Sequence, residues 1–314
     1  MDLNLYFSRL KPDKVHSLVG AIELLDQWIL KILEDGLRIL EQDDSRLQEI
    51  STRLSDLGAG ALSKRIRLFK EFIATENWQE RILHELATMS KLTHLIQSKS
   101  SLSLYDAEDI LAYIGFSHKK ADVMALNIQQ QDQWKLIGQL NEKEEQLRLR
   151  RSWFYGNSTQ SIALVLEYQV NVFSPYQVYK FNRDYHDKVY FYPGAVKQRI
   201  VQLSTDKSSP PANWNITVKS LEESIEDFQK ALLANPFLQN FVQIITGCRI
   251  IKIKDQFYLQ DQNGLLLAIA NNIEQLNKIY PYTLSKDCIF FLERGQNLQN
   301  KILSLLLGEL HIFV

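Results

Sequence analysis

The residue types that most readily do acid–base chemistry gather in one short stretch, Arg183–Asp187, which reads Arg-Asp-Tyr-His-Asp. A histidine flanked by carboxylates has a raised pKa and can act as a general acid or base. The same run of charges is typical of an exposed turn. An enzyme would be expected to bring several of the following together in a pocket: His84, Glu167, Asp184 and His186. The stretch by itself leaves both interpretations open.

No known catalytic motif accompanies this stretch. The sequence lacks GxxxxGK[ST], GxGxxG, HExxH and GxSxG. His84 and His94 have the wrong spacing for a helical metal pair, and Glu80 with His84 fits a surface ion pair. Cys248 and Cys288 have no histidines at ligand spacing, so we expect buried thiols, although a disulfide between them stays open. The sequence therefore predicts no catalytic residue, no cofactor and no metal site, and no stoichiometric zinc.

Two basic clusters are candidate contacts for a partner protein or a nucleic acid. The first lies on a predicted helix and comprises Lys64, Arg65, Arg67 and Lys70. The second comprises Arg148, Arg150 and Arg151, directly before Trp153, Phe154 and Tyr155. Basic residues beside aromatic residues are typical of grooves for single-stranded nucleic acid. However, three glutamates shortly before the second cluster reduce its field, which favours a solvated helix end beside aromatic core residues.

Bulk composition is that of an ordinary globular protein. The chain has 314 residues, of which 45% are apolar, and its net charge is −1 at pH 7. A nearly neutral protein has no global field that attracts nucleic acid or an anionic membrane. Residues 1–10 lack the features of a signal peptide, and no apolar run approaches the length of a membrane span. We therefore expect a cytoplasmic protein without a membrane contact.

Proline placement separates a helical part from a β-rich part. No proline stands between Pro12 and Pro175, and this stretch is rich in strong helix formers. Apolar residues repeat at helical spacing most clearly from Trp78 to Ile96. Asp13 is the expected cap of the first helix, and Gly36 its expected end. Helices are predicted over residues 14–36, 57–73, 78–96, 106–114, 119–130 and 139–150.

Near Arg151 the pattern changes to that of strands. Strands are predicted over residues 161–168, 249–254, 256–260 and 265–270, and one helix over 221–234. The turn Gln262-Asn263-Gly264 is a strong hairpin signal. The expected fold class is α+β, with an N-terminal helical bundle over residues 1–150 followed by a β-rich domain with a few helices over residues 151–314.

An ordered set of segments resembles the bacterial SWIM zinc-finger family, in the long helical region and β-rich tail that follow its finger. The matching segments are LEDGL (33–37), LSDLGAGALSKRIRLF (54–69), WQERILHELATMSKLTHLI (78–96), the segment 134–156, FYPGA (191–195), LLANPFLQNFVQI (232–244) and YLQDQNGLLLAI (258–269). The CxC…CxH pattern of the family's finger is absent from this sequence. The finger's zinc and its nucleic-acid binding are therefore not implied for this chain.

The resemblance implies a partner rather than a reaction. Genes of this family often lie beside genes for a MoxR-type AAA+ ATPase and a von Willebrand factor A-domain protein. That context implies a non-enzymatic interaction or adaptor subunit that works with these two proteins. The alternative is a nucleic-acid-binding accessory protein, which would require the two basic clusters to share one face.

Overall fold

The computed structural model describes residues 10–98, 102–144, 147–169, 176–283, 288–295 and 299–314. Residues 1–9, on which the expectation of no signal peptide was based, lie outside the described part. The chain forms two compact units. The first unit is Met1–Ser117 together with Asn235–Phe237, and the second is His118–Ala234 together with Leu238–Val314.

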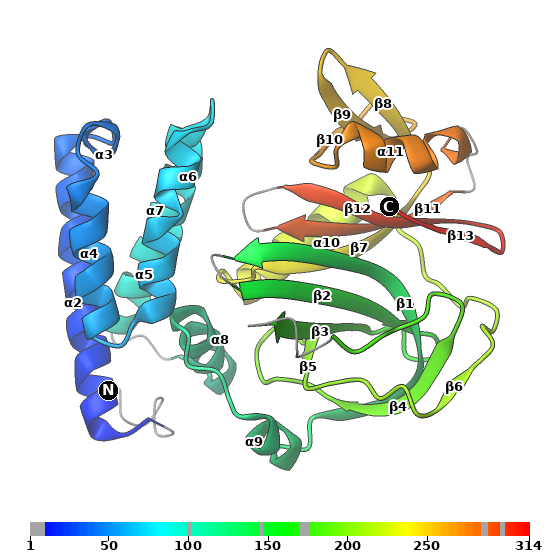
Figure 1. Ribbon diagram of the computed structural model, residues 1–314, viewed down its shortest axis with the longest axis horizontal. Helices are drawn as coiled ribbons and strands as arrows, with labels where there is room; N and C mark the ends of the chain where they lie inside the picture. Colours follow the sequence, from blue (N-terminus) through cyan, green and yellow to red (C-terminus); the bar gives the residue numbers. More distant parts are fainter. Residues whose placement is uncertain (1–9, 99–101, 145–146, 170–175, 284–287, 296–298) are drawn as a thin grey trace. The chain divides into compact units, whose positions relative to one another are not determined.

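The first unit is a bundle of helices around one apolar core (Figure 1). Its described helices are α2 (Pro12–Asp35), α3 (Ile39–Gln42), α4 (Ser45–Asp56), α5 (Gly60–Arg67), α6 (Phe69–Ile73), α7 (Trp78–Gln97) and α8 (Leu104–Ile114). The apolar face of each long helix turns inward because its apolar residues recur every three or four positions. The predicted helices over 14–36, 78–96 and 106–114 are confirmed.

The helix ends explain where the sequence prediction was accurate and where it failed. Pro12, not Asp13, begins α2, because proline has no N–H to lose at the first helical position. Gly36 ends that helix with a φ of 84°, as predicted. The predicted helix over 57–73 is divided into α5 and α6, and α4 was not predicted. Helix α8 begins at a capping box formed by Ser103 and Asp106.

The second unit contains three sheets and three α-helices among its described residues. The strand pairs are antiparallel except for the parallel pair of Ile162–Gln169 with Arg199–Ile200. The helices are α9 (Lys120–Ala125), α10 (Leu221–Ala234) and α11 (Ile273–Ile279), followed by the 3-10 turn η1 (Tyr280–Tyr282). The six-stranded sheet has the order β5 (Arg199–Ile200), β3 (Ile162–Gln169), β2 (Leu147–Gly156), β1 (Gln129–Glu144), β4 (Asp184–Tyr190), β6 (Ser208–Ser209). The four-stranded sheet has the order β13 (Leu310–Phe313), β12 (Asn300–Leu307), β11 (Ile289–Gly295), β7 (Asn240–Thr246). The three-stranded sheet has the order β10 (Leu266–Ile269), β9 (Gln256–Gln260), β8 (Arg249–Ile253).

Figure 1 shows these sheets as successive layers of the second unit. Between the six- and four-stranded sheets lies a core that includes Ile137, Trp153, Phe291 and Leu303. A second core lies between the four-stranded sheet, the three-stranded sheet and the helices α10 and α11. A third core includes Trp134 and Phe154 and covers part of the six-stranded sheet. The two larger sheets thus pack as a sandwich.

The two larger sheets approach each other closely at Gly138 of β1. A Cβ atom at this position would lie 2.5 Å from the Cβ of Leu303 on β12. Nearby, the hydroxyl of Ser304 donates a hydrogen bond of 2.5 Å to the carbonyl oxygen of Ile137. The strand β1 changes register against β2 between Leu136 and Gly138. Glycine is required here because the backbone of β1 meets a side chain of the facing sheet without intervening space.

The fold class is confirmed: an N-terminal helical region precedes a β-rich region with a few helices. The predicted strands over 161–168, 249–254, 256–260 and 265–270, and the helix over 221–234, are confirmed. The predicted helix over 139–150 is wrong, because residues 139–144 and 147–150 lie on the paired strands β1 and β2, and 145–146 lie outside the described residues. The predicted helix over 119–130 is reduced to α9. Helix therefore gives way to strand between α9 and β1, and not near Arg151.

Candidate functional site

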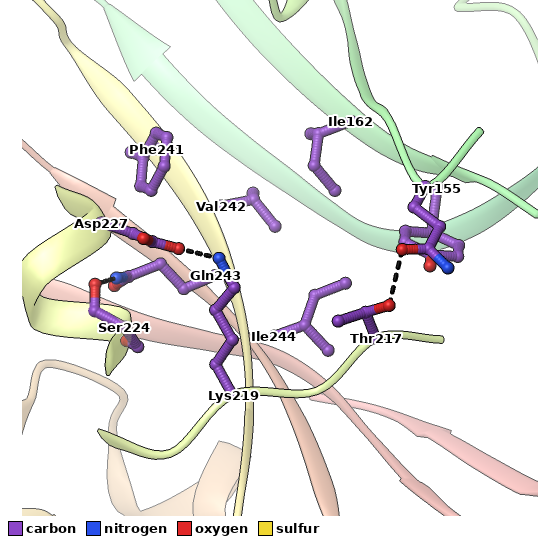
Figure 2. A pocket seen from close by; sticks show the side chains of 11 residues that line it. Tyr155, Ile162, Thr217, Lys219, Ser224, Asp227, Phe241, Val242, Gln243 and Ile244 are labelled. Carbon is purple, nitrogen blue, oxygen red and sulfur yellow. Dashed lines mark hydrogen bonds and ion pairs between the residues drawn. The ribbon is translucent and has the colours of Figure 1, made fainter. Parts of the chain in front are cut away.

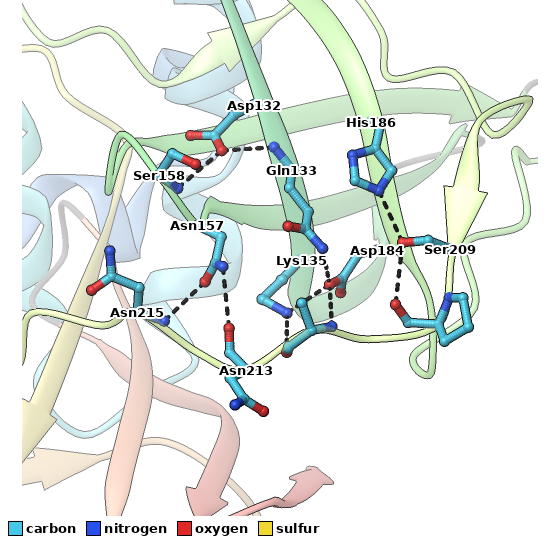
Figure 3. A network of polar contacts seen from close by, with 12 residues as sticks. Asp132, Gln133, Lys135, Asn157, Ser158, Asp184, His186, Ser209, Asn213 and Asn215 are labelled. Carbon is cyan, nitrogen blue, oxygen red and sulfur yellow. Dashed lines mark hydrogen bonds and ion pairs between the residues drawn. The ribbon is translucent and has the colours of Figure 1, made fainter.

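A segment of irregular backbone runs across strands β4, β1 and β2 of the six-stranded sheet and is held there by their side chains. We call this segment, residues 210–219, the strap. Asp184 of β4 is buried and accepts hydrogen bonds from the Lys135 ammonium at 2.7 Å and from the backbone N–H of Ala212 at 2.8 Å (Figure 3). Lys135 also donates to the carbonyl oxygen of Ala212 at 2.6 Å, and its ammonium lies 5.0 Å from the ring centre of Trp214. Sheet side chains thus replace the partner strand that this backbone lacks.

Further along, Asn157 holds the strap by both ends of its amide (Figure 3). Its Nδ2 donates to the carbonyl oxygen of Asn213 at 3.1 Å, and its Oδ1 accepts from the N–H of Asn215 at 2.9 Å. The hydroxyl of Tyr155 donates to the carbonyl oxygen of Asn215 at 2.8 Å. The strap then joins β7, where the N–H and C=O of Lys219 both form backbone hydrogen bonds. The course of the strap is therefore fixed at both ends.

The predicted acid–base stretch contributes Asp184 to the side chains that hold the strap. The interpretation of Arg183–Asp187 as an exposed turn is wrong, because Asp184–Tyr190 form the strand β4. His186 is exposed, and its Nε2 lies 2.9 Å from the hydroxyl of Ser209. Glu167 lies on β3, which two strands separate from β4, and accepts a hydrogen bond from the N–H of Gln177. His84 is exposed on α7 in the first unit. Glu167 and Asp184 therefore do not meet within the second unit.

Beyond the strap lies a cavity of about 240 Å³, which we call the strap cavity (Figure 2). Its walls come from the strap, the first turns of α10, strand β7, and the segment joining β2 to β3. Its polar lining comprises Gln160, Thr217, Lys219, Ser224, Asp227 and Gln243. Its apolar lining comprises Tyr155, Ile162, Phe241, Val242 and Ile244. Ligand sites in proteins commonly combine an apolar lining with a few placed polar groups.

Charged and neutral polar groups sit side by side on the wall of this cavity. The Lys219 ammonium and the Asp227 carboxylate form an ion pair, and both side chains are partly exposed. The hydroxyl of Thr217 donates to the amide oxygen of Gln160 at 2.5 Å. Ser224 and Gln243 are more than nine-tenths buried. The Gln243 amide donates to the carbonyl oxygen of Ser224, but among the described residues neither Ser224 Oγ nor Gln243 Oε1 has a hydrogen-bond partner.

None of these cavity residues was identified from the sequence as a site residue. The one local signal is the capping box of Ser220 and Glu223, whose reciprocal hydrogen bonds start α10. That start places Ser224 and Asp227 one turn apart on the helix, on the same face. The motif indicates a helix start and nothing more, because the other lining residues come from distant segments.

The first predicted basic cluster does not form a freely exposed cationic face. Arg65 lies over the ring of Tyr113, with its guanidinium carbon 4.1 Å from the ring centre. Arg67 donates to the hydroxyl of Ser63 at 2.7 Å and is exposed, and Lys64 is partly buried. Lys70 is exposed and forms an ion pair with Asp44. Each of Arg65, Arg67 and Lys70 is thus engaged by a neighbour within the first unit.

The second basic cluster is divided between surface and interior. Arg148 is exposed, and Arg150 bonds Asn141 at 2.9 Å and lies over the ring of Tyr176. Arg151 is buried, which removes it from the predicted contact residues, and it forms ion pairs with Glu142 at 2.7 Å and Glu293 at 3.0 Å. Its position is inward because residues alternate between the faces of β2.

The aromatic run beside that cluster belongs to the core, as predicted. Trp153 and Phe154 are 0% exposed and Tyr155 is 1% exposed. The indole N–H of Trp153 donates to the Glu293 carboxylate at 2.5 Å. Bases stack only on rings whose faces are accessible. These rings therefore offer no platform to a nucleic acid beside Arg148 and Arg150.

Cys248 and Cys288 are buried and unbridged, as expected for buried thiols. Burial, with the nearby negative charge of Asp261, raises the pKa of Cys248 to about 12. Within the described ranges, no three His, Cys, Asp or Glu side chains gather closely enough to hold a metal ion. Of the helices in the described part, none combines the length and apolar character that crossing a membrane requires.

The first unit has a cavity of its own, a groove of about 440 Å³ between α2 and α4. Its lining includes the half-buried Trp28, whose ring centre lies 6.5 Å from that of Phe69. Ile32 and Ile50 lie at its floor, and basic groups at its rim are Lys31, Arg46 and Arg53. An indole surrounded by such side chains is typical of sites where proteins bind each other.

Residues 14–114, about a third of the chain, match the SWIM-associated four-helix bundle domain. This match covers most of the helical unit and none of the sheets. No curated protein and no solved structure matches the chain.

Proposed function

We propose that this chain is a non-enzymatic interaction or adaptor subunit, and that its SWIM-associated bundle supplies the surface that binds the partner. The groove between α2 and α4 is the observation that carries the proposal. Trp28 offers a large apolar surface that is already ordered by its neighbours, so little side-chain entropy is lost on binding. A buried aromatic anchor at the centre of a polar rim is the usual anatomy of an interface hot spot.

The lining of the groove carries three basic residues, Lys31, Arg46 and Arg53, against two acidic ones, Asp43 and Glu49, and this small excess favours a partner that presents acidic residues around an apolar one. Arg46 bonds Asp35 at 2.7 Å, and Arg53 lies 3.7 Å from Glu49. These pairs are solvent-exposed and therefore weak, so their arginines can exchange partners at low cost. Complementary charge would raise the association rate more than the affinity.

The predicted basic face extends this surface. Lys70 pairs with Asp44, which directly precedes Ser45 at the start of α4. Ser45 and Asp43 line the groove, so Lys70 and the groove share one end of α4. In this proposal Lys64, Arg67 and Lys70 add long-range attraction, whereas Trp28 supplies most of the binding energy.

The proposed partner is a MoxR-type AAA+ ATPase or the von Willebrand factor A-domain protein encoded with it. The resemblance to the SWIM zinc-finger family supports this choice, and the bundle match at residues 14–114 supports the part of that resemblance that lies in the helices. The chain itself carries no phosphate-binding motif, so any nucleotide dependence of the complex would come from the ATPase.

Co-expression with each partner followed by size-exclusion chromatography, with and without nucleotide, tests the proposal. We expect co-elution at roughly micromolar concentration and its loss in Trp28→Ala. Tyr105→Ala, which removes an exposed ring from α8 outside the groove, is the matched control and should co-elute as the wild type does. Separate elution of the wild-type proteins under every condition would refute the adaptor proposal.

A further inference from the structure

The strap cavity of the second unit has the volume and mixed lining of a small-ligand site, and it belongs to a different unit from the groove proposed above to bind a partner. Its position is fixed, because the strap that forms one wall is held by Asp184, Lys135 and Asn157. A ligand that enters such a cavity meets walls that are already ordered, which limits the entropy lost on binding.

The charges on the wall define the electrical character of that ligand. Lys219 and Asp227 carry opposite charges and neutralise each other. A ligand with one charge would pair with one of them and leave the other without its counter-ion in a partly buried place. A ligand with both charges can replace the single internal pair by two pairs, one at Lys219 and one at Asp227.

Neutral polar groups at the inner end of the cavity add a hydrogen-bonding preference. Gln243 Oε1 is an acceptor and Ser224 Oγ is a donor and an acceptor, and both are buried without a partner among the described residues. Leaving such groups without hydrogen bonds costs about 1–3 kcal/mol each. An ammonium group, which donates three hydrogen bonds, can serve Asp227 and Gln243 together.

The rest of the lining defines the ligand's body. Ile162, Val242, Ile244 and Phe241 present apolar surface among the polar side chains of the lining (Figure 2). Burying an aliphatic or aromatic side chain there contributes about 25 cal/mol for each Å² removed from water. The volume of about 240 Å³ restricts the ligand to a molecule of a few non-hydrogen atoms beyond its charged end.

From this arrangement we infer that the strap cavity binds a free α-amino acid with an apolar side chain. Its carboxylate pairs with Lys219, its ammonium pairs with Asp227 and the amide oxygen of Gln243, and its side chain packs on Val242 and Ile244. Binding replaces the internal Lys219–Asp227 pair, whose side chains are both partly exposed, by one ion pair from each of them to the ligand.

Isothermal titration calorimetry of the full chain with L-leucine and with L-phenylalanine tests this inference. We expect at least one of them to bind in the micromolar to low millimolar range, about −4 to −8 kcal/mol. The two halves of leucine, 4-methylpentanoate and 3-methylbutylamine, should each bind roughly tenfold or more weakly, because each leaves one wall charge unpaired. Chemical shift changes of isoleucine and valine methyl groups should centre on Ile162, Val242 and Ile244.

Two variants with a matched control complete the test. Asp227→Asn should weaken amino-acid binding roughly tenfold or more through loss of the ammonium's counter-ion. Glu222→Gln removes an exposed carboxylate from the same helix outside the cavity and should bind as the wild type does. Thermal melting of both variants checks that they fold. If Asp227→Asn unfolds, the comparison of leucine with 4-methylpentanoate and 3-methylbutylamine on the wild-type protein still decides the test. Absence of binding at about 10 mM for both amino acids, or equal binding of leucine and its singly charged halves, would overturn the inference.

Discussion

Arg151 and Glu293 connect the two larger sheets of the second unit through an ion pair of 3.0 Å between Nη2 and Oε1. Arg151 belongs to β2 and Glu293 to β11, and both side chains are buried. A buried ion pair adds little stability compared with apolar residues, but removal of one member reduces the electrostatic compensation of the other. The contact between the sheets is therefore sensitive to any substitution that neutralises only one of the two.

We predict that Glu293→Gln lowers the free energy of unfolding by about 1–3 kcal/mol, because Arg151 loses one of its two carboxylate partners and keeps Glu142. Urea unfolding followed by circular dichroism measures the change. In the double variant Arg151→Met, Glu293→Gln the buried positive charge is gone, so its loss of stability should be smaller than the sum of the two single losses. A Glu293→Gln variant as stable as the wild type would contradict this account.

Glu142 should make stability depend on acidic pH. Burial disfavours its charged form, but Arg151 and Lys301 more than compensate and lower its pKa from 4.5 to about 2. The unfolded chain therefore takes up a proton near pH 4.5, whereas the folded chain does so only near pH 2. The stability that Glu142 contributes is complete above that window and is lost as pH falls through it. We predict that Glu142→Gln destabilises the protein at about pH 6 and has less effect near pH 2.5. A difference between the two proteins that stays constant with pH would be inconsistent with the pairing.

His311 should produce a second pH dependence, at a higher range. Burial lowers its pKa from 6.5 to about 4, and the positive charge of Lys135 acts in the same direction. Below pH 6.5 His311 is protonated in the unfolded chain, whereas in the folded chain it becomes protonated only near pH 4. The free energy of unfolding therefore falls as pH drops through this window. We predict that His311→Gln loses less stability than the wild type between about pH 7 and pH 4.5. Denaturation midpoints across that range provide the measurement, and parallel curves for the two proteins would argue against a neutral, partly buried imidazole.

Trp153→Ala should destabilise the protein by roughly 3–5 kcal/mol, the usual cost of removing a buried large aromatic side chain. The indole is 0% exposed and its N–H is bonded to Glu293, so the variant loses both packing and a hydrogen bond. Thermal melting by circular dichroism measures the loss. A variant that melts like the wild type but binds single-stranded DNA or RNA more weakly would instead support a stacking role.

Gly138→Ala tests the close approach of the two larger sheets. A methyl group there would lie 2.5 Å from the Cβ of Leu303, which has no flexible end to move aside. Overpacking of this kind costs about 1–3 kcal/mol. The companion variant Gly60→Ala adds a methyl group into open space and should leave stability nearly unchanged. Equal stability of both variants would show that the sheets can separate without cost.

Long periodic segments of the fold were predictable from sequence, whereas the β1–β2 hairpin was not. The stripe of α7 repeats every three or four residues over five turns, and only a helix buries such a stripe. Residues 139–150 are rich in Gln, Glu, Lys, Leu and Arg, which favour helix in isolation. In the folded chain the end of β1 pairs with the start of β2, for example Asn141 with Arg150 and Glu142 with Leu149. Pairing and burial against the facing sheet outweigh the intrinsic preference, and neither can be read from a local window.

The candidate site was beyond the reach of the sequence for a related reason. Lys219, Asp227 and Gln243 belong to the strap, a helix and a strand, and each residue is unremarkable in its local context. Conversely, Arg151 attracted attention because it stood among other cations, yet the alternation of β2 turns it inward. Charge clusters in a sequence indicate function only when the strand or helix that carries them is correctly placed.

The strap is held through its backbone, and this has a consequence for mutational tolerance. Asp184, Lys135, Asn157 and Tyr155 bond to main-chain N–H and C=O groups, which every amino acid other than proline supplies. Side chains along residues 212–216 are therefore free to vary, apart from two: the ring of Trp214 packs against Phe291 and His311, and Ile216 packs against the core between the two larger sheets. The anchors have no such freedom. A deep mutational scan should find a permissive strap between intolerant anchors, so the strap can change in sequence at residues 212, 213 and 215 while its course over the sheet stays constant.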